Sequence, residues 1–103
     1  MVNVAGGVRM SEPALDLGVA LALASSFLDR PVPADTLIFG EVGLTGEVRA
    51  VSAPEVRLKE GAKLGFRRAM LALRQKESLG EFPGLELIGV DTLAAAIRSL
   101  FPK

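Results

Sequence analysis

The segment between Asp16 and Asp29 contains only Leu, Gly, Val, Ala, Ser and Phe, and this charge-free segment constrains the fold more than any other feature of the 103-residue chain. Ser11 and Pro13 precede it in the arrangement typical of a helix start, with serine as the N-cap and proline in the first turn. We therefore predict a helix from there to about Phe27. Because its apolar residues leave almost no polar face, we expect this helix to be buried on most sides, at the centre of the core.

Strand-like and helix-like segments alternate along the rest of the chain. The segments that predict strands are Val2–Ala5, Val8–Met10, Thr36–Val42, Glu47–Val51, Arg68–Leu73 and Leu85–Val90. Two further helices are predicted over Pro54–Leu64, ended by Gly65, and over Thr92–Leu100, capped by Asp91, with a loop or short helix over Gln75–Phe82. This order predicts a single α/β domain over residues 1–103, with a mixed, partly parallel sheet. Because Met1 stands directly before a strand-like segment, we expect the domain to be a fragment of a longer protein.

The composition excludes several kinds of site, because the chain has no cysteine and no histidine. Disulfides, Cys/His metal sites, cysteine nucleophiles and histidine acid–base catalysis are all ruled out. Gly6-Gly7 and the pair Gly43 and Gly46 lack the spacing of a phosphate-binding P-loop, so we interpret them as turn residues and expect no cofactor and no metal. The longest apolar stretch, Leu17–Ala24, is far shorter than the roughly 20 residues that cross a bilayer. The absence of cysteine also fits a cytosolic location.

The charge is unevenly distributed, although the 12 basic and 12 acidic residues of the chain balance. Residues 49–76 hold eight basic and two acidic residues, a net charge of +6, whereas residues 1–48 carry −4. Lys59 and Lys63 lie roughly 40° apart on the predicted helix and share a face, whereas Arg57 lies roughly 120° from Lys63. Three interpretations remain open: a solvated helix surface, a face that binds a polyanion, and a basic surface that docks on an acidic surface of a neighbouring subunit.

Several motifs resemble known families when their order and spacing are considered together. Gly40–Arg49, with the sequence GEVGLTGEVR, resembles the hairpin motif of Lon-type protease domains. Asn3–Arg9, Glu12–Leu17 and Arg57–Phe66 resemble the matching runs of the RadA (Sms) family of bacterial DNA-repair proteins. The last run departs from that family at Gly61, where the family usually has alanine. The Lon-like domain of the magnesium-chelatase-like ATPases shares the hairpin motif and gives a related interpretation.

The resemblance implies a Lon-protease-like (ribosomal protein S5 domain 2-like) α/β sandwich with a mixed sheet, at the C-terminus of a longer cytoplasmic protein. It implies a scaffold for a homo-hexameric ring, an upstream RecA-like ATPase domain, and contact with single-stranded or branched DNA during recombination and repair. DNA contact is expected through the phosphates, with little sequence preference. The candidate DNA-binding side chains are Arg9, Arg49, Arg57, Lys59, Lys63, Arg67 and Arg68.

Active Lon-type domains use a Ser–Lys dyad, and the resemblance places Ala14 and Glu55 at the two matching positions. Alanine carries no nucleophile, and glutamate is not a lysine-type base, so we expect this domain not to be an enzyme. One alternative is an offset dyad drawn from Ser11, Ser52 and Lys59, although Ser11 is better explained as a helix cap. Another is a degenerate protease domain that is retained as a peptide-binding or regulatory module.

Overall fold

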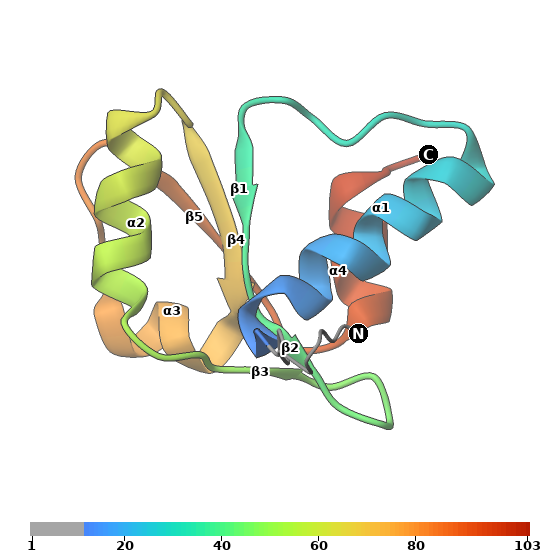
Figure 1. The fold of residues 1–103 in the computed structure, drawn as a ribbon, viewed down its shortest axis with the longest axis horizontal. Coiled ribbons are helices and arrows are strands. Elements are labelled where there is room, and N and C mark those ends of the chain that lie inside the picture. The colour runs from blue at the N-terminus through green and yellow to red at the C-terminus, as the bar shows by residue number, and fades with distance from the viewer. Residues whose placement is uncertain (1–11) are drawn as a thin grey trace, which may run out of the picture.

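Three parallel strands form the central sheet of the computed structural model, which describes residues 12–103. In spatial order they are β1 (Thr36–Ile38), β4 (Arg68–Ala72) and β5 (Glu86–Val90) (Figure 1). Within the middle strand β4, Ala69, Met70 and Leu71 are completely buried. This burial explains the continuously apolar sequence of β4, because a parallel strand that is covered on both faces has no polar side.

An antiparallel hairpin accompanies the parallel sheet, in which β2 (Glu41–Val42) pairs with β3 (Val48–Arg49). The predicted single strand over Thr36–Val42 is therefore broken between β1 and β2. The break lies at Gly40, whose N–H donates to the carbonyl of Ala14 at 2.9 Å instead of extending the pairing with β4. The structure thus confirms an α/β fold with both parallel and antiparallel pairing, and the two kinds of pairing form separate ladders within residues 12–103.

The short helix α3 (Leu73–Leu79) follows β4 directly, so the segment predicted as a loop or short helix over Gln75–Phe82 forms a helix that begins earlier than expected. A residue of α3, Gln75, also explains why β3 is shorter than the predicted strand Glu47–Val51. The Gln75 side chain donates from Nε2 to the Val51 carbonyl at 2.7 Å and accepts from the Val51 N–H at 3.3 Å. The Gln75 side-chain amide therefore makes the two backbone hydrogen bonds of Val51 that a neighbouring strand would otherwise make.

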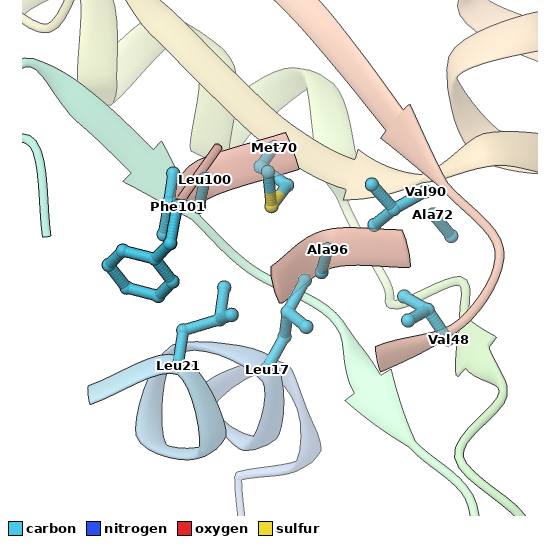
Figure 2. Packing of buried hydrophobic residues seen from close by; sticks show 9 residues of the cluster. All are labelled: Leu17, Leu21, Val48, Met70, Ala72, Val90, Ala96, Leu100 and Phe101. Carbon is cyan, nitrogen blue, oxygen red and sulfur yellow. The ribbon is translucent and has the colours of Figure 1, made fainter. Parts of the chain in front are cut away.

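Helices cover both faces of the sheet (Figure 1). One face carries α1 (Asp16–Leu28) and α4 (Leu93–Leu100), and the other carries α2 (Pro54–Lys63) and α3. Alternation along β4 divides the core between these faces, because successive side chains of a strand point in opposite directions. Met70 packs with Leu17 and Leu21 of α1 and with residues of α4 (Figure 2), whereas Leu71 packs with Leu58 of α2.

The prediction that α1 is a central helix, buried on most sides, is wrong for this structure. Leu17 and Leu21 are completely buried, but Val19, Leu23 and Phe27 are 56%, 68% and 91% exposed. The helix belongs to an outer layer, so only its inner side meets the sheet and α4 (Figure 1). Its composition shows that the helix is apolar, but the number of neighbours that cover it depends on the tertiary arrangement.

The helix ends agree only partly with the predicted caps. Thr92, not Asp91, caps α4, because its hydroxyl oxygen accepts a hydrogen bond from the Ala95 N–H at 3.0 Å. Gly65 follows α2 with a φ of +96°, which confirms the predicted glycine stop, since glycine adopts this conformation without strain.

At the start of the described chain, a 3-10 turn, η1 (Pro13–Leu15), leads into α1. The Glu12 side chain accepts from the Ala14 N–H of this turn at 3.3 Å. Three predictions lie outside the described residues, namely the Ser11 cap and the strands Val2–Ala5 and Val8–Met10.

Candidate functional site

A pocket of about 200 Å³ lies between η1, the hairpin and the start of α2. Ala14, the residue predicted to stand where active Lon-type domains have their serine, lies in its wall and is 2% exposed. Two backbone hydrogen bonds hold this wall: Gly40 N–H donates to the Ala14 carbonyl at 2.9 Å, and Leu17 N–H donates to the Gly40 carbonyl at 3.0 Å. The residue is therefore firmly positioned at a pocket, but its methyl group offers no nucleophile.

The cationic side chain at this pocket is Arg57, which the dyad prediction did not identify. Its Nε–H donates to the Ser52 carbonyl at 2.9 Å, and its guanidinium lies 3.5 Å from the Glu12 carboxylate and 5.9 Å from the centre of the Phe39 ring. Glu55, the residue at the predicted lysine position, is exposed on the first turn of α2 and does not line the pocket. An arginine stays protonated at neutral pH, so it cannot take a proton as the dyad lysine does.

The offset dyad finds little support in this geometry. Ser52 lines the pocket, but Lys59 does not, and no lysine of residues 12–103 is among the lining side chains. Ser11 lies outside the described part of the chain. The sequence signal for Arg57 is its place at the start of the RadA-like run Arg57–Phe66, directly before Leu58, a completely buried residue of α2. Neither feature specifies which element the Arg57 side chain meets.

The structure groups three of the predicted DNA-binding residues at one end of the sheet. Lys63 ends α2, and Arg67 and Arg68 lie where the chain enters β4, so all three belong to the upper end of the sheet in Figure 1. The backbone N–H groups of Arg67 and Arg68 both donate to the Asp35 carbonyl, which fixes this entry beside β1. Lys59 lies one turn before Lys63 and is also exposed. We call Lys59, Lys63, Arg67 and Arg68 the basic end.

The remaining candidates lie elsewhere. Arg57 is at the pocket, and Arg49 is on the hairpin at the opposite end of the sheet (Figure 1). Arg9 lies outside the described residues. The +6 charge of residues 49–76 is therefore spread over at least three places, of which the basic end is the densest.

Two residues of the basic end, Lys63 and Arg68, form exposed ion pairs. Arg68 lies 3.5 Å from Glu86, and Lys63 lies 4.0 Å from Glu60, with largely exposed side chains in both pairs. Exposed pairs of this kind contribute about 0–1 kcal/mol, so they can exchange for a phosphate. Lys59 and Arg67 have no ion-pair partner among residues 12–103.

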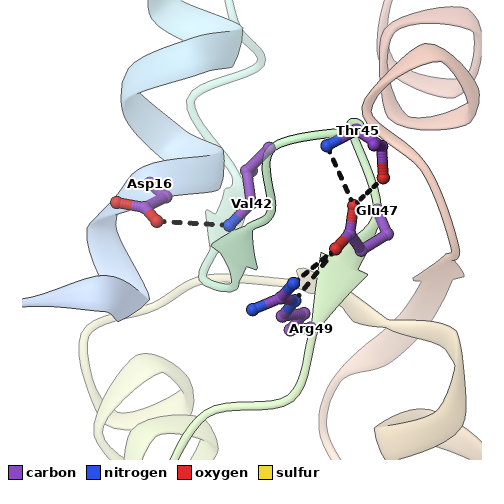
Figure 3. Close-up of polar contacts among 5 residues, drawn as sticks. All are labelled: Asp16, Val42, Thr45, Glu47 and Arg49. Carbon is purple, nitrogen blue, oxygen red and sulfur yellow. Dashed lines mark hydrogen bonds and ion pairs between the residues drawn. The ribbon is translucent and has the colours of Figure 1, made fainter.

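Arg49 is held more firmly, within a network on the hairpin (Figure 3). The Glu47 carboxylate accepts from the N–H and hydroxyl of Thr45 and pairs with the Arg49 guanidinium. The Thr45 hydrogen bond, a backbone hydrogen bond and Arg49 together lower the pKa of Glu47 from 4.5 to about 2. Reciprocally, Glu47 raises the pKa of Arg49. Asp16 of α1 also accepts from the Val42 N–H at 3.2 Å, so the hairpin is fastened to the helix layer.

Among residues 12–103, no group of three or more acidic side chains is placed to hold a metal ion. Within the same residues, no helix is both long and apolar enough to cross a membrane.

Comparison with known proteins defines the class of this chain. The family model described as subunit ChlI of Mg-chelatase matches residues 1–75. The chain therefore belongs to this ChlI family. Curated relatives identify the particular type of region within it, because they carry the name DNA repair protein RadA.

The relative from Bacillus subtilis is 50% identical over 99 residues, which cover 95% of this chain and 21% of the relative. The relative from Aquifex aeolicus is 47% identical over 100 residues, covering 97% of this chain and 22% of the relative. The relative from Synechocystis is 46% identical over 101 residues, which cover 98% of this chain and 20% of the relative. The chain is thus a RadA-related region that spans about a fifth of the length of these curated relatives.

Proposed function

We propose that this chain is the Lon-protease-like C-terminal domain of a RadA-type DNA-repair protein. It serves as a non-catalytic scaffold that binds DNA and supports assembly of a homo-hexameric ring. The observation that carries the proposal is the basic end, where Lys59 and Lys63 in the last two turns of α2 and Arg67 and Arg68 at the entry to β4 lie at the same end of the sheet, in a chain with RadA relatives. An upstream RecA-like ATPase domain supplies ATP hydrolysis, and the whole protein acts on single-stranded or branched DNA in the cytoplasm.

The pocket at Ala14 supports a non-catalytic role. A Ser–Lys mechanism needs a hydroxyl to attack and an amine that can take its proton. At this pocket the corresponding groups are a methyl group and a guanidinium, which is paired with Glu12 and with the Ser52 carbonyl. Arg57 of α2 therefore connects to Glu12, the residue before η1, and the pocket at the dyad position has a structural role.

Phosphates are the DNA groups that the basic end suits best. Exposed Lys and Arg side chains attract the backbone by releasing condensed counterions, and this attraction is independent of sequence. Phe66 is the one aromatic residue near the basic end in sequence, and it is half-buried against the α2 side of the core. Stacking on bases is therefore not part of the proposed binding mode.

The test is fluorescence anisotropy of a labelled single-stranded oligonucleotide at several salt concentrations. The test variant replaces Lys59, Lys63, Arg67 and Arg68 with alanine. The matched control replaces Arg74, Lys76, Arg98 and Lys103 with alanine, which removes the same charge elsewhere on the protein. The proposal expects a large loss of affinity in the first variant only, and equal losses in both would contradict a localised DNA surface.

The pocket also favours a second candidate function, a degenerate protease domain that binds peptides without cleaving them. Ala14, Val51 and Ser52 line a small cavity in which a single side chain could be held. Binding of a casein-derived peptide that is lost on filling the cavity by Ala14→Leu would support this candidate. Unchanged peptide binding in that variant would exclude the cavity as the binding site.

A further inference from the structure

The strand β5 has a free edge. It is the last strand of the order β1-β4-β5, and no strand of residues 12–103 pairs with its outer side. Its Glu86 N–H donates inward to the Arg67 carbonyl at 3.0 Å. Because the direction of the backbone groups alternates along a strand, the N–H and C=O groups of Leu87 and Gly89 point away from β4.

A groove with a volume of about 650 Å³ lies between α3 and the start of β5. Both Glu86 and Leu87 line it, although adjacent residues of a strand point to opposite faces of the sheet. The cavity therefore reaches the first residues of β5, including Leu87, whose backbone groups point outward. Its apolar wall comes from Phe82, Pro83 and Leu85 of the segment between α3 and β5. The groove therefore places apolar surface next to outward-pointing backbone groups.

The charge of the groove is acidic. Three carboxylates line it, those of Glu77, Glu81 and Glu86, with the single ammonium of Lys76. Glu86 is paired with Arg68 at 3.5 Å, so Glu77 and Glu81 supply the acidic charge that has no ion-pair partner among residues 12–103. The edge also lacks the usual protection against pairing, because β5 contains no proline and only one charged residue, Glu86. This acidic lining repels phosphate, so the groove differs in kind from the basic end at which DNA binding is proposed.

We propose that this groove binds an extended peptide segment that carries basic side chains and adds to β5 as a further strand. The outward groups of Leu87 and Gly89 supply the main-chain hydrogen bonds, as in other cases of β-strand addition. The carboxylates select basic residues on alternate positions of the peptide, and the apolar wall holds the side chains between them. The occupant is thus a peptide segment of a protein partner. Glu77 and Glu81 lie outside the basic end, and the Arg68–Glu86 ion pair is the point at which the two surfaces meet.

The experiment uses a fluorescein-labelled peptide, Lys-Val-Lys-Val-Lys-Val, titrated into the whole 103-residue chain. The test variant is Glu77→Lys/Glu81→Lys, and the matched control is Glu55→Lys/Glu60→Lys on α2, which changes the net charge equally. All four glutamates are exposed, so neither variant disturbs the core. Affinity is expected to fall about fivefold or more in the test variant and to change less than about twofold in the control.

Amide hydrogen exchange reports strand addition itself. Peptide binding is expected to slow exchange at Leu87 and Gly89, and a peptide with N-methylated valines is expected to give no such protection. Equal weakening in both charge variants, or binding without protection of these two amides, would overturn the proposal. Concentration-dependent protection of the same amides without any peptide would also overturn it, because the edge would then be occupied by a second copy of the chain.

Discussion

Leu21→Ala and Leu23→Ala form a matched pair of substitutions that tests the placement of α1. The two leucines lie two residues apart on one helix, and both substitutions remove the same atoms. Leu21 is completely buried in a cluster with Met70 and Phe101 (Figure 2). Leu23, by contrast, is 68% exposed. Any difference between the two variants therefore reports burial, since the change in helix propensity is the same for both.

The expected magnitudes follow from this difference. Removing a buried leucine side chain costs about 2–5 kcal/mol of unfolding free energy, through lost burial and the cavity that remains. Leu21→Ala is expected to fall in this range, because its site touches both the sheet and α4. Leu23→Ala is expected to change the unfolding free energy by less than about 0.5–1 kcal/mol, since most of its side chain is already in water.

Urea unfolding followed by circular dichroism measures both values under the same conditions. The midpoint should fall strongly for Leu21→Ala and little for Leu23→Ala, with unchanged slopes. A cost of 2 kcal/mol or more for both substitutions would refute the outer-layer position of α1, because it would require Leu23 to be buried too.

Three other predictions concern the hairpin, the pocket and a helix cap. Folding lowers the pKa of Glu47 from 4.5 to about 2, so its stabilising effect is present above about pH 4.5 and is lost as the pH falls towards 2. Glu47→Gln is therefore expected to flatten the acid side of the stability curve in that window, and a carboxyl NMR titration midpoint near 4.5 in the native protein would contradict this. Ala14→Ser is expected to restore no peptidase activity, because Arg57 cannot act as the base, and fluorophosphonate labelling of the new serine would show the opposite. Thr92→Ala is expected to cost about 1 kcal/mol in urea unfolding, and Asp91→Ala less than half of that; the reverse order would make Asp91 the cap.

Local chemistry made much of the fold predictable. The apolar run of β4 predicted a covered strand, and Gly65 predicted the end of α2, because each depends on one short segment. Burial of α1 was not predictable in the same way. Its sequence is equally apolar on the side of Leu21 and on the side of Leu23, so only the arrangement of the layers decides which side is covered.

The candidate site shows the same limit. The sequence identified Ala14 as lacking a nucleophile, but it did not identify Arg57 as the cation at the same pocket, since Arg57 of α2 reaches it through a contact with Glu12, far away in sequence. Similarly, Lys63 and Arg67 are close in sequence, whereas Arg49 lies at the far end of the sheet although its charge is the same. Charge along the chain indicates which residues are basic, and the topology determines which of them lie at the same end of the sheet.

The slope of DNA affinity against salt concentration tests the central proposal most directly. For single-stranded DNA, each phosphate contact contributes about 0.7 to the slope of log affinity against log salt. Replacement of Lys59, Lys63, Arg67 and Arg68 by alanine is therefore predicted to reduce this slope by up to about 3. Replacement of Arg74, Lys76, Arg98 and Lys103 is predicted to leave it unchanged. An unchanged slope in the first variant, or an equal reduction in both, would contradict DNA binding at the basic end.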